Sequence, residues 1–279
     1  DPRQLRHFVA IDRQNRKVIL AISGTYTHKE AMVDLNGYSR DFLFGEAHAG
    51  ISIVTERLWD KVSNKIVELL DKHIGFELIV TGHSLGGGCT CLLNLLLHHD
   101  TRMRRRRFRC FSFASPPVFA PAPSSLVAAT TASGTNVFDK ECLTCVSFIN
   151  QYDAIPFLSG DSVRHQMAMI VAVDKAMTNP LQRANVLLGD EQPDTELVQQ
   201  IHDIQRNPLP VTKPGAPRFM CIPAMGNVWL WPNPLKKDSF TARLANSLKM
   251  AETGLFIHRN DLTDHLPARY DYVLNHAEQ

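Results

Sequence analysis

Apolar residues recur at two different periods along this chain of 279 residues. Short apolar or alternating runs bounded by turn residues predict strands, and these runs are 7–12, 17–23, 77–80, 109–115 and 143–150. Apolar residues three or four apart predict a long helix over 47–73, closed by Gly75, and a shorter helix over 89–97. Residues 25–44 are expected to be irregular or to form a short helix. This alternation predicts an α/β fold, with a mostly parallel central sheet and helices on both faces.

The second half of the chain has a different pattern. Residues 173–217 are polar, helical in their spacing and punctuated by prolines. We expect them to form a cap or regulatory insertion near the active-site mouth. Segments 219–222 and 227–231 are expected to pair as a hairpin, and 262–276 to form the final helix. Residues 1–279 are therefore expected to form a single domain.

The segment Gly82-His83-Ser84-Leu85-Gly86 lies between a predicted strand and a predicted helix. This is the setting of a nucleophile elbow, a sharp strand-to-helix turn that holds a serine hydroxyl clear of the sheet. A β-carbon at Gly82 or Gly86 is expected to collide with the neighbouring chain. The helix N-terminus also places unpaired N–H groups beneath the reacting carbonyl. We therefore predict that Ser84 is a nucleophile, with His83 as a packing residue below it.

A serine hydroxyl needs a base, and the base needs an acid that orients it. In α/β-hydrolases these residues follow the serine in the order acid, then histidine. Asp153 fits the acid because it comes just after a predicted strand. His265 fits the base because it precedes Leu266-Pro267 at the start of the final helix, with His258 as the alternative base. Asp261 or Asp264 is the alternative acid, since both are near His265 in the sequence.

The tetrahedral oxyanion of such a reaction needs two preorganised hydrogen-bond donors. The backbone N–H of Leu85, directly after the nucleophile, is one candidate. The other is Thr25, which offers an N–H and a hydroxyl at the end of an early strand. Gly24 before it lets the backbone approach a substrate closely. Chemistry of this kind requires no metal and no organic cofactor.

Several motifs together indicate a family. In chain order they are Ser23-Gly24-Thr25, Ala47-His48-Ala49-Gly50, Gly82-His83-Ser84-Leu85-Gly86-Gly87, residues 150–159 and Asp264-His265-Leu266-Pro267. The combination resembles the class 3 lipases, which are fungal-type triacylglycerol lipases and their relatives, and most of all the eukaryotic diacylglycerol lipase branch. The resemblance covers about residues 5–160 and 218–276. It implies the α/β-hydrolase fold. It also implies that Ser84, Asp153 and His265 form a catalytic triad and that Thr25 and Leu85 form the oxyanion hole.

The resemblance also implies a function. We expect a serine-dependent lipase that hydrolyses acyl esters of di-, mono- or triacylglycerol and releases a fatty acid through an acyl-enzyme. A phospholipase A1 or a short-chain carboxylesterase on the same scaffold is the second interpretation. A catalytically silent, lipase-like interaction module is the third.

Composition and charge bear on partners and location. The formal net charge of +2 gives no bulk electrostatic signal for nucleic acid. A lipid or ester substrate is the expected partner, and contact with a membrane or lipid-droplet surface stays open. The arginines within 102–109 fit either lipid headgroup contact or a solvated connector. We expect a cytoplasmic or peripheral membrane location. Secretion stays open, because the chain starts at Asp1 without a methionine.

Two further patterns have competing interpretations. Trp229 and Trp231 fit an interfacial anchor, although alternation in a hairpin buries at least one such side chain in most proteins. Three cysteines, Cys89, Cys91 and Cys110, are expected to be small buried apolar residues. Cys142 and Cys145 have CxxC spacing but no companion pair, which argues against zinc or redox use.

Overall fold

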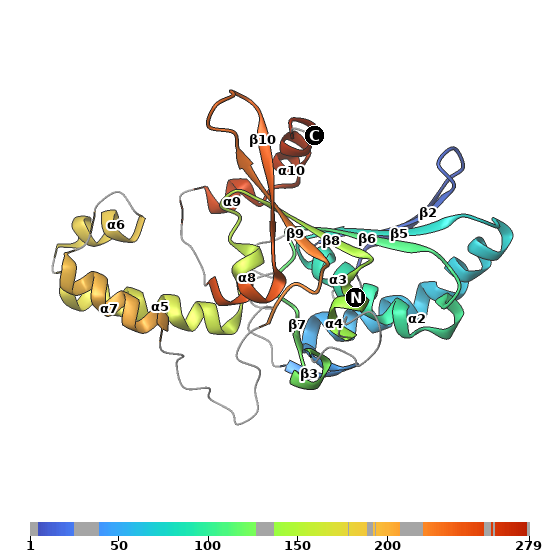
Figure 1. The fold of residues 1–279 in the computed structure, drawn as a ribbon, viewed down its shortest axis with the longest axis horizontal. Helices are drawn as coiled ribbons and strands as arrows, with labels where there is room; N and C mark the ends of the chain where they lie inside the picture. Colours follow the sequence, from blue (N-terminus) through green and yellow to red (C-terminus); the bar gives the residue numbers. More distant parts are fainter. Residues whose placement is uncertain are drawn as a thin grey trace.

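The structure, a computed structural model, describes residues 5–24, 39–126, 137–177, 179–188, 192, 194–206, 220–253, 258 and 260–277. Its central sheet has the strand order β1-β2-β5-β6-β8-β9-β10 (Figure 1). The strands are β1 (His7–Asp12), β2 (Lys17–Ile22), β5 (Glu77–His83), β6 (Phe108–Phe113), β8 (Cys145–Asn150), β9 (Gly226–Pro232) and β10 (Phe240–Ala245). The five inner strands are parallel, and β1 and β10 pair antiparallel at the edges. The predicted mostly parallel sheet is confirmed.

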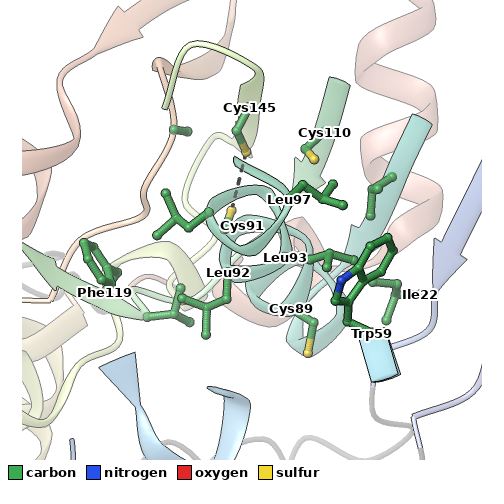
Figure 2. Close-up of a cluster of buried hydrophobic side chains, with 14 of the residues drawn as sticks. Ile22, Trp59, Cys89, Cys91, Leu92, Leu93, Leu97, Cys110, Phe119 and Cys145 are labelled. Atoms are coloured by element: carbon green, nitrogen blue, oxygen red, sulfur yellow. Dashed lines mark hydrogen bonds between the residues drawn. The ribbon is translucent and has the colours of Figure 1, made fainter. Parts of the chain in front are cut away.

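Helices cover both faces of this sheet, as predicted. On one face lie α2 (Ala49–Lys72), α3 (Leu85–His99) and α4 (Val137–Cys142), and on the other α9 (Asp261–Asp264) and α10 (Pro267–Asn275) (Figure 1). The α3 helix lies against β5 and β6 and contacts α2. The core around α3 includes Leu92 and Leu93, with Ile22 of β2 and Trp59 of α2 (Figure 2). Burial of these side chains holds α3, the helix that begins at the elbow, in place against the sheet.

All six cysteines are free thiols and buried. Cys89 and Cys91 lie in α3, and Cys110 lies in β6 (Figure 2). The sulfurs of Cys91 and Cys145 are 3.9 Å apart, within a weak hydrogen bond. The prediction that Cys89, Cys91 and Cys110 are small core residues is confirmed.

A second, three-stranded sheet contacts α2. Its strands are β3 (Ser39–Phe42), β4 (Gly45–His48) and β7 (Phe119–Pro121). The expectation that 25–44 is irregular or helical is wrong for residues 39–42, whereas 25–38 lie outside the described residues. The strands β3 and β4 are short and mostly polar, so they give no alternating pattern. The rings of Phe42 and Phe44 make edge-to-face contacts with Phe119 of β7, and this packing stabilises strands that the local sequence pattern does not predict.

The expected hairpin of 219–222 with 227–231 is also wrong. The strand β9 pairs instead with β10, which lies further along the chain. Cys221 forms an isolated bridge with Phe119 in the second sheet, and Phe219 lies outside the described residues. The β10 strand is an edge strand with three consecutive exposed residues, 242–244, so its sequence carries no buried face to recognise.

Three helices follow the sheet strand β8 and project from the body of the molecule (Figure 1). They are α5 (Gly160–Ala176), α6 (Pro180–Leu188) and α7 (Thr195–Arg206). Val173 and Leu197 are buried, each 1% exposed, in α5 and α7, which contact each other. This helical group begins at Gly160, before the expected boundary at 173, because Ser159 caps α5 with a capping box. Residues 207–219 lie outside the described residues.

The remaining described elements are α8 (Ser247–Thr253) and the short 3-10 helices η1 (Thr101–Met103), η2 (Pro123–Leu126) and η3 (Ile155–Phe157). Within the described ranges, no helix is both long enough and apolar enough to cross a membrane.

Candidate active site

Ser84 occupies a strained turn between β5 and α3. Its backbone has φ 57° and ψ −123°, a combination that side-chain-bearing residues rarely adopt. Such a conformation costs on the order of 1–3 kcal/mol and persists only where surrounding structure holds it. Here the N–H of Ser84 donates to the carbonyl of Phe113 at 2.9 Å, and the α3 helix starts at the next residue. The sharp turn expected of a nucleophile elbow is therefore present.

The glycines around Ser84 are required by close backbone packing. A β-carbon on Gly82 would overlap the carbonyl group of Gly86. A β-carbon on Gly86 would overlap the carbonyl oxygen of Ile22 at the end of β2. The predicted collisions at both positions are confirmed, and they show that β2, β5 and α3 meet at the elbow.

His265 lies in a break between two short helices instead of at the start of one long helix. The expected helix over 262–276 is divided into α9, which ends at Asp264, and α10, which starts at Pro267. Leu266 between them is extended, with φ −66° and ψ 137°. A residue before proline is sterically excluded from the helical region, and proline suits the first turn of the next helix. The break directs the His265 ring towards the elbow.

The structure brings Ser84, His265 and Asp153 together in one hydrogen-bonded chain. Nε2 of His265 lies 3.0 Å from Oγ of Ser84, and Nδ1 lies 3.0 Å from Oδ1 of Asp153. The three side chains come from positions up to 181 residues apart in sequence. Ser84 and His265 are 6% and 5% exposed, and Asp153 is fully buried. A shielded environment of this kind strengthens each of these polar contacts.

Asp153 is held by the loop that follows β8. Its N–H donates to the carbonyl of Asn150 at 2.9 Å, and its Oδ1 also accepts from the N–H of Ile155 at 3.0 Å. The η3 turn continues from Ile155 into α5. The carboxylate therefore sits at the carboxyl edge of the sheet, where β8 ends beside the elbow.

Two residues that the sequence analysis did not single out complete this arrangement. The hydroxyl of Tyr270 in α10 donates to Oδ2 of Asp153 at 2.6 Å and accepts from the N–H of Asn150 at 3.0 Å. Burial and the charge of Asp153 raise the pKa of Tyr270 well above its usual value, so the phenol stays a donor. The side chain of Asn150 donates to the carbonyl of Asp264 at 2.9 Å, which ties α9 to β8. The sequence signal for Tyr270 is its spacing of three residues from Val273, which indicates that both side chains lie on the same buried face of the helix.

The alternative site residues have other contacts. The ring of His258 stacks on Tyr152 with centroids 3.8 Å apart. The carboxylate of Asp261 accepts from the N–H of His258, and that of Asp264 from the N–H of Tyr152 at 3.3 Å. Among the described contacts, the partners of His265 are therefore those first predicted.

The loop after β2 lies directly against the elbow. A β-carbon on Gly24 would be 2.7 Å from the carbonyl oxygen of His83 and 3.3 Å from Cβ of Ser84. Leu85 is the first residue of α3, where backbone N–H groups have no partner within the helix. Thr25, the other predicted oxyanion donor, lies outside the described residues. Both predicted donors thus remain predictions, and Gly24 lies in a narrow space beside Ser84.

His83 packs beside the candidate base. Its ring centroid lies 4.8 Å from that of His265 and 5.5 Å from that of Tyr270. Burial, then the nearby charge of His265, lowers the pKa of His83 to about 4. The ring is therefore neutral near pH 7 and adds no positive charge next to His265. Within the described residues, no group of three or more acidic, histidine or cysteine side chains could hold a metal ion.

A mostly parallel sheet with a serine at a strand-to-helix elbow defines the α/β-hydrolase fold. Within this fold, the chain belongs to the lipase (class 3) family, whose description matches residues 19–163, just over half of the chain. These lipases are carboxylic ester hydrolases acting on lipid substrates.

Diacylglycerol lipase-alpha from Homo sapiens is 30% identical over 122 residues, which are 39% of this chain and 11% of that protein. Diacylglycerol lipase-beta from Mus musculus is 25% identical over 121 residues, 40% of this chain and 18% of that protein. The chain thus spans less than a fifth of the length of these curated relatives. Among solved structures, lipase II from Rhizopus niveus is similar with a TM-score of 0.47 and 21% identity, covering 57% of both chains. The Lip2 lipase from Yarrowia lipolytica has a TM-score of 0.45 and 14% identity, covering 57% of this chain and 58% of that one.

Proposed function

We propose that this chain is a serine-dependent lipase in which Ser84, His265 and Asp153 act as a catalytic triad. The observation that carries the proposal is the hydrogen-bonded chain among the three side chains, with both histidine contacts at 3.0 Å. Their order along the sequence, serine, aspartate, histidine, is that of α/β-hydrolases. The strained backbone of Ser84 supports the same role, because strain of this kind is concentrated at functional sites.

The geometry suggests how each group would act. Nε2 of His265 takes the proton of Ser84 as the oxygen attacks the ester carbonyl. Asp153 stabilises the resulting imidazolium through Nδ1, and Tyr270 and Ile155 keep the carboxylate in place. His265 then gives the proton to the departing alcohol. Water activated by the same histidine hydrolyses the acyl-enzyme and releases the fatty acid.

The negative charge that develops on the carbonyl oxygen needs donors at the elbow. We propose the N–H of Leu85 as one donor, because it is at the start of α3. Thr25 is the second, since the preceding Gly24 lies against Ser84. Removing one such donor lowers kcat by about 10²–10³ in a related arrangement.

The substrates that we propose are acyl esters of glycerides, namely di-, mono- or triacylglycerol. Family membership and the names of the curated relatives support this choice. A phospholipase A1 or short-chain carboxylesterase would use the same side chains and differ in the surfaces around them. The intact trio of side chains is an argument against a catalytically silent module.

We also propose that the helices α5, α6 and α7 gate access of lipid to Ser84. The group starts directly after the acid loop, because α5 begins at Gly160 and is preceded by η3. Its contacts are mainly internal, between α5 and its two neighbours. A shortened variant that lacks α6 and α7 is expected to keep its fold and change its preference between bulky and short-chain esters.

The decisive experiment is labelling by a fluorophosphonate probe, which reacts only with an activated serine. Wild type is expected to be labelled, Ser84→Ala unlabelled, and His258→Ala labelled like wild type. Matched assays with diacylglycerol, triacylglycerol, a phospholipid and a water-soluble ester then separate the enzyme classes. Labelling that survives in Ser84→Ala would contradict the proposed nucleophile, and absence of labelling in wild type would favour the silent module.

A further inference from the structure

The hairpin of β9 and β10 ends in an apex with an exposed apolar side chain next to two cations. Leu235 is 95% exposed, and Lys236 and Lys237 are exposed beside it. In Figure 1 the hairpin extends beyond the body of the molecule at the top of the view. A single exposed leucine is common on protein surfaces, so exposure alone does not indicate a role for Leu235. Its position relative to Ser84 is the relevant observation.

The strand registers place this apex at the same edge of the sheet as Ser84. His83, Phe113, Phe148 and Val228 are paired in a row across β5, β6, β8 and β9. Ser84 follows that row directly, whereas β9 continues four residues further, to Pro232. At about 3.3 Å per residue, the hairpin extends roughly 13 Å beyond the level of the row.

The apex is ordered by its own hydrogen bonds. The N–H of Asn233 donates to the carbonyl of Ser239 at 2.8 Å, and the N–H of Leu235 donates to Oδ1 of Asn233 at 2.9 Å. The acidic residue of the apex, Asp238, accepts from the hydroxyl of Tyr272 in α10 at 3.3 Å. The turn therefore holds Leu235 in solvent while the carboxylate is bonded towards α10.

Aromatic and apolar side chains lie between the apex and the candidate active site. The ring of Trp231, one residue before the end of β9, is 5.0 Å from that of Tyr152 and 5.4 Å from that of Trp229. Tyr152, next to Asp153 in sequence, is 38% exposed, and Leu266, next to His265, is 43% exposed. Tryptophan and tyrosine are enriched where proteins meet the boundary between lipid and water.

We propose that the β9–β10 apex is a docking element for an anionic lipid surface. Leu235 enters the outer acyl region, and Lys236 and Lys237 contact the headgroups. Trp231 and Tyr152 then lie closer to the lipid–water boundary. Insertion by about 5–10 Å, typical of interfacial elements, would bring the level of Ser84 near the headgroups. A lipid ester would then reach the nucleophile without leaving the surface, a step that rests on the proposed lipase function.

The arginines of residues 102–109 are a poorer docking surface for this purpose. Three of them form ion pairs, which are Arg102–Asp100, Arg106–Asp71 and Arg109–Glu77. Glu77 is the first residue of β5, whereas Ser84 follows the last, so this cluster lies about 20 Å away at the opposite edge. A membrane held there would face away from the candidate active site. The same edge carries Ile74, which is 86% exposed and serves as a matched control for Leu235.

The test is flotation of the purified chain with vesicles of phosphatidylcholine and phosphatidylserine, in about a 4:1 ratio. Leu235→Ser is expected to weaken binding about tenfold, whereas Ile74→Ser leaves it unchanged. The double variant Lys236→Gln with Lys237→Gln is expected to lose about tenfold on these vesicles and little on phosphatidylcholine alone. Its control is Arg104→Gln with Arg105→Gln, with charges at the opposite edge.

Two additional measurements keep the outcome decisive. Leu235→Trp is expected to strengthen vesicle binding severalfold, a change opposite in direction to that of Leu235→Ser. Hydrolysis of a water-soluble short-chain ester reports active-site integrity in each variant, so failure of the lipase proposal is visible separately from failure of docking. Equal losses in Leu235→Ser and Ile74→Ser, or no loss in either, would overturn the docking proposal. Loss only in the arginine variant would place the docking surface at the opposite edge.

Discussion

The hydroxyl of Tyr270 lies 2.6 Å from Oδ2 of Asp153, the same oxygen that lies 3.1 Å from Nδ1 of His265. Both groups are buried, and the raised pKa of Tyr270 keeps its proton in this bond. A hydrogen bond to a charged group contributes about 1.5–3 kcal/mol, so this contact helps to hold and orient the Asp153 carboxylate. It links the last helix of the chain to the acid of the proposed triad.

Removing that hydroxyl is the first prediction. Tyr270→Phe is expected to lower kcat about tenfold and the free energy of unfolding by about 2 kcal/mol, because Asp153 loses a donor in a dry environment. Steady-state kinetics and urea denaturation measure the two effects. Tyr272→Phe is the matched control, since its hydroxyl bonds Asp238 at the surface at 3.3 Å. Equal effects in both variants would mean that the Asp153 contact has no special role.

The backbone strain at Ser84 gives a second prediction. Ser84→Ala and Ser84→Gly both remove the nucleophile and its bond to His265, so each is expected to lose activity by about 10⁴ or more. Glycine alone adopts φ 57° and ψ −123° without steric strain. The glycine variant should therefore be more stable than the alanine variant by about 1 kcal/mol. Calorimetric melting of the pair checks this, and one-tenth of wild-type activity in either variant would contradict the assignment.

The two late histidines should behave differently. His265→Ala is expected to lose activity by about 10³–10⁴, since the proton of Ser84 then has no acceptor. His258→Ala should change kcat less than about threefold, because that ring stacks on Tyr152 and its Nδ1 accepts from the N–H of Asn260. The readout is kcat with a soluble ester. A reversed result would assign the base to His258.

Glycine substitutions at two positions test the packing of the elbow. Gly86→Ala is expected to destabilise the fold by about 3 kcal/mol, because the new β-carbon overlaps backbone atoms of Ile22 that cannot move aside. Gly160→Ala is the control, since a β-carbon there meets nothing within 4 Å at the start of α5. It should stabilise slightly, by about 0.5 kcal/mol. Urea midpoints of the two variants decide whether the elbow is as tightly packed as the distances indicate.

The neutral state of His83 predicts a pH dependence of stability. Its pKa is about 4 when folded, against 6.5 as the ordinary value, so the unfolded chain binds more protons between these two values. Stability should therefore fall as the pH decreases from about 6.5 towards 4. We expect His83→Phe to remove about 1–2 kcal/mol of this loss between pH 7 and 5. Urea denaturation at both pH values compares the variant with wild type, and identical slopes would contradict the prediction.

Local patterns were sufficient where an element buries one face against a continuous core. The strand β2, in which every second residue is buried, and the long helix α2 follow from the sequence pattern, because each buries one face. The elbow was predictable for a different reason. Gly82 is required by the turn itself, because a β-carbon there would overlap the carbonyl group of Gly86, whereas Gly86 is required by the close approach of Ile22 from β2.

The errors occur where the local pattern is weak or was misread, and where a partner is distant in sequence. The strand β10 has exposed residues at 242–244, so nothing in its own pattern identifies it as the neighbour of β9. The break at His265 is caused by Pro267, because the residue before a proline is disfavoured in the helical region. The prediction of a single helix over 262–276 did not take this effect into account. Tyr270 was missed because its partner, Asp153, is 117 residues away.

The sequence by itself determined the α/β alternation, the position of the strained serine and the residue types that could serve it. Those features depend on period, steric fit and chain order, which are local properties. Only the tertiary structure decided which acid and which histidine meet Ser84, because that choice depends on where β8 and the α9–α10 break end in space. It also decided that the β9–β10 apex shares an edge with Ser84, since strand register is set by long-range hydrogen bonds that no local pattern contains.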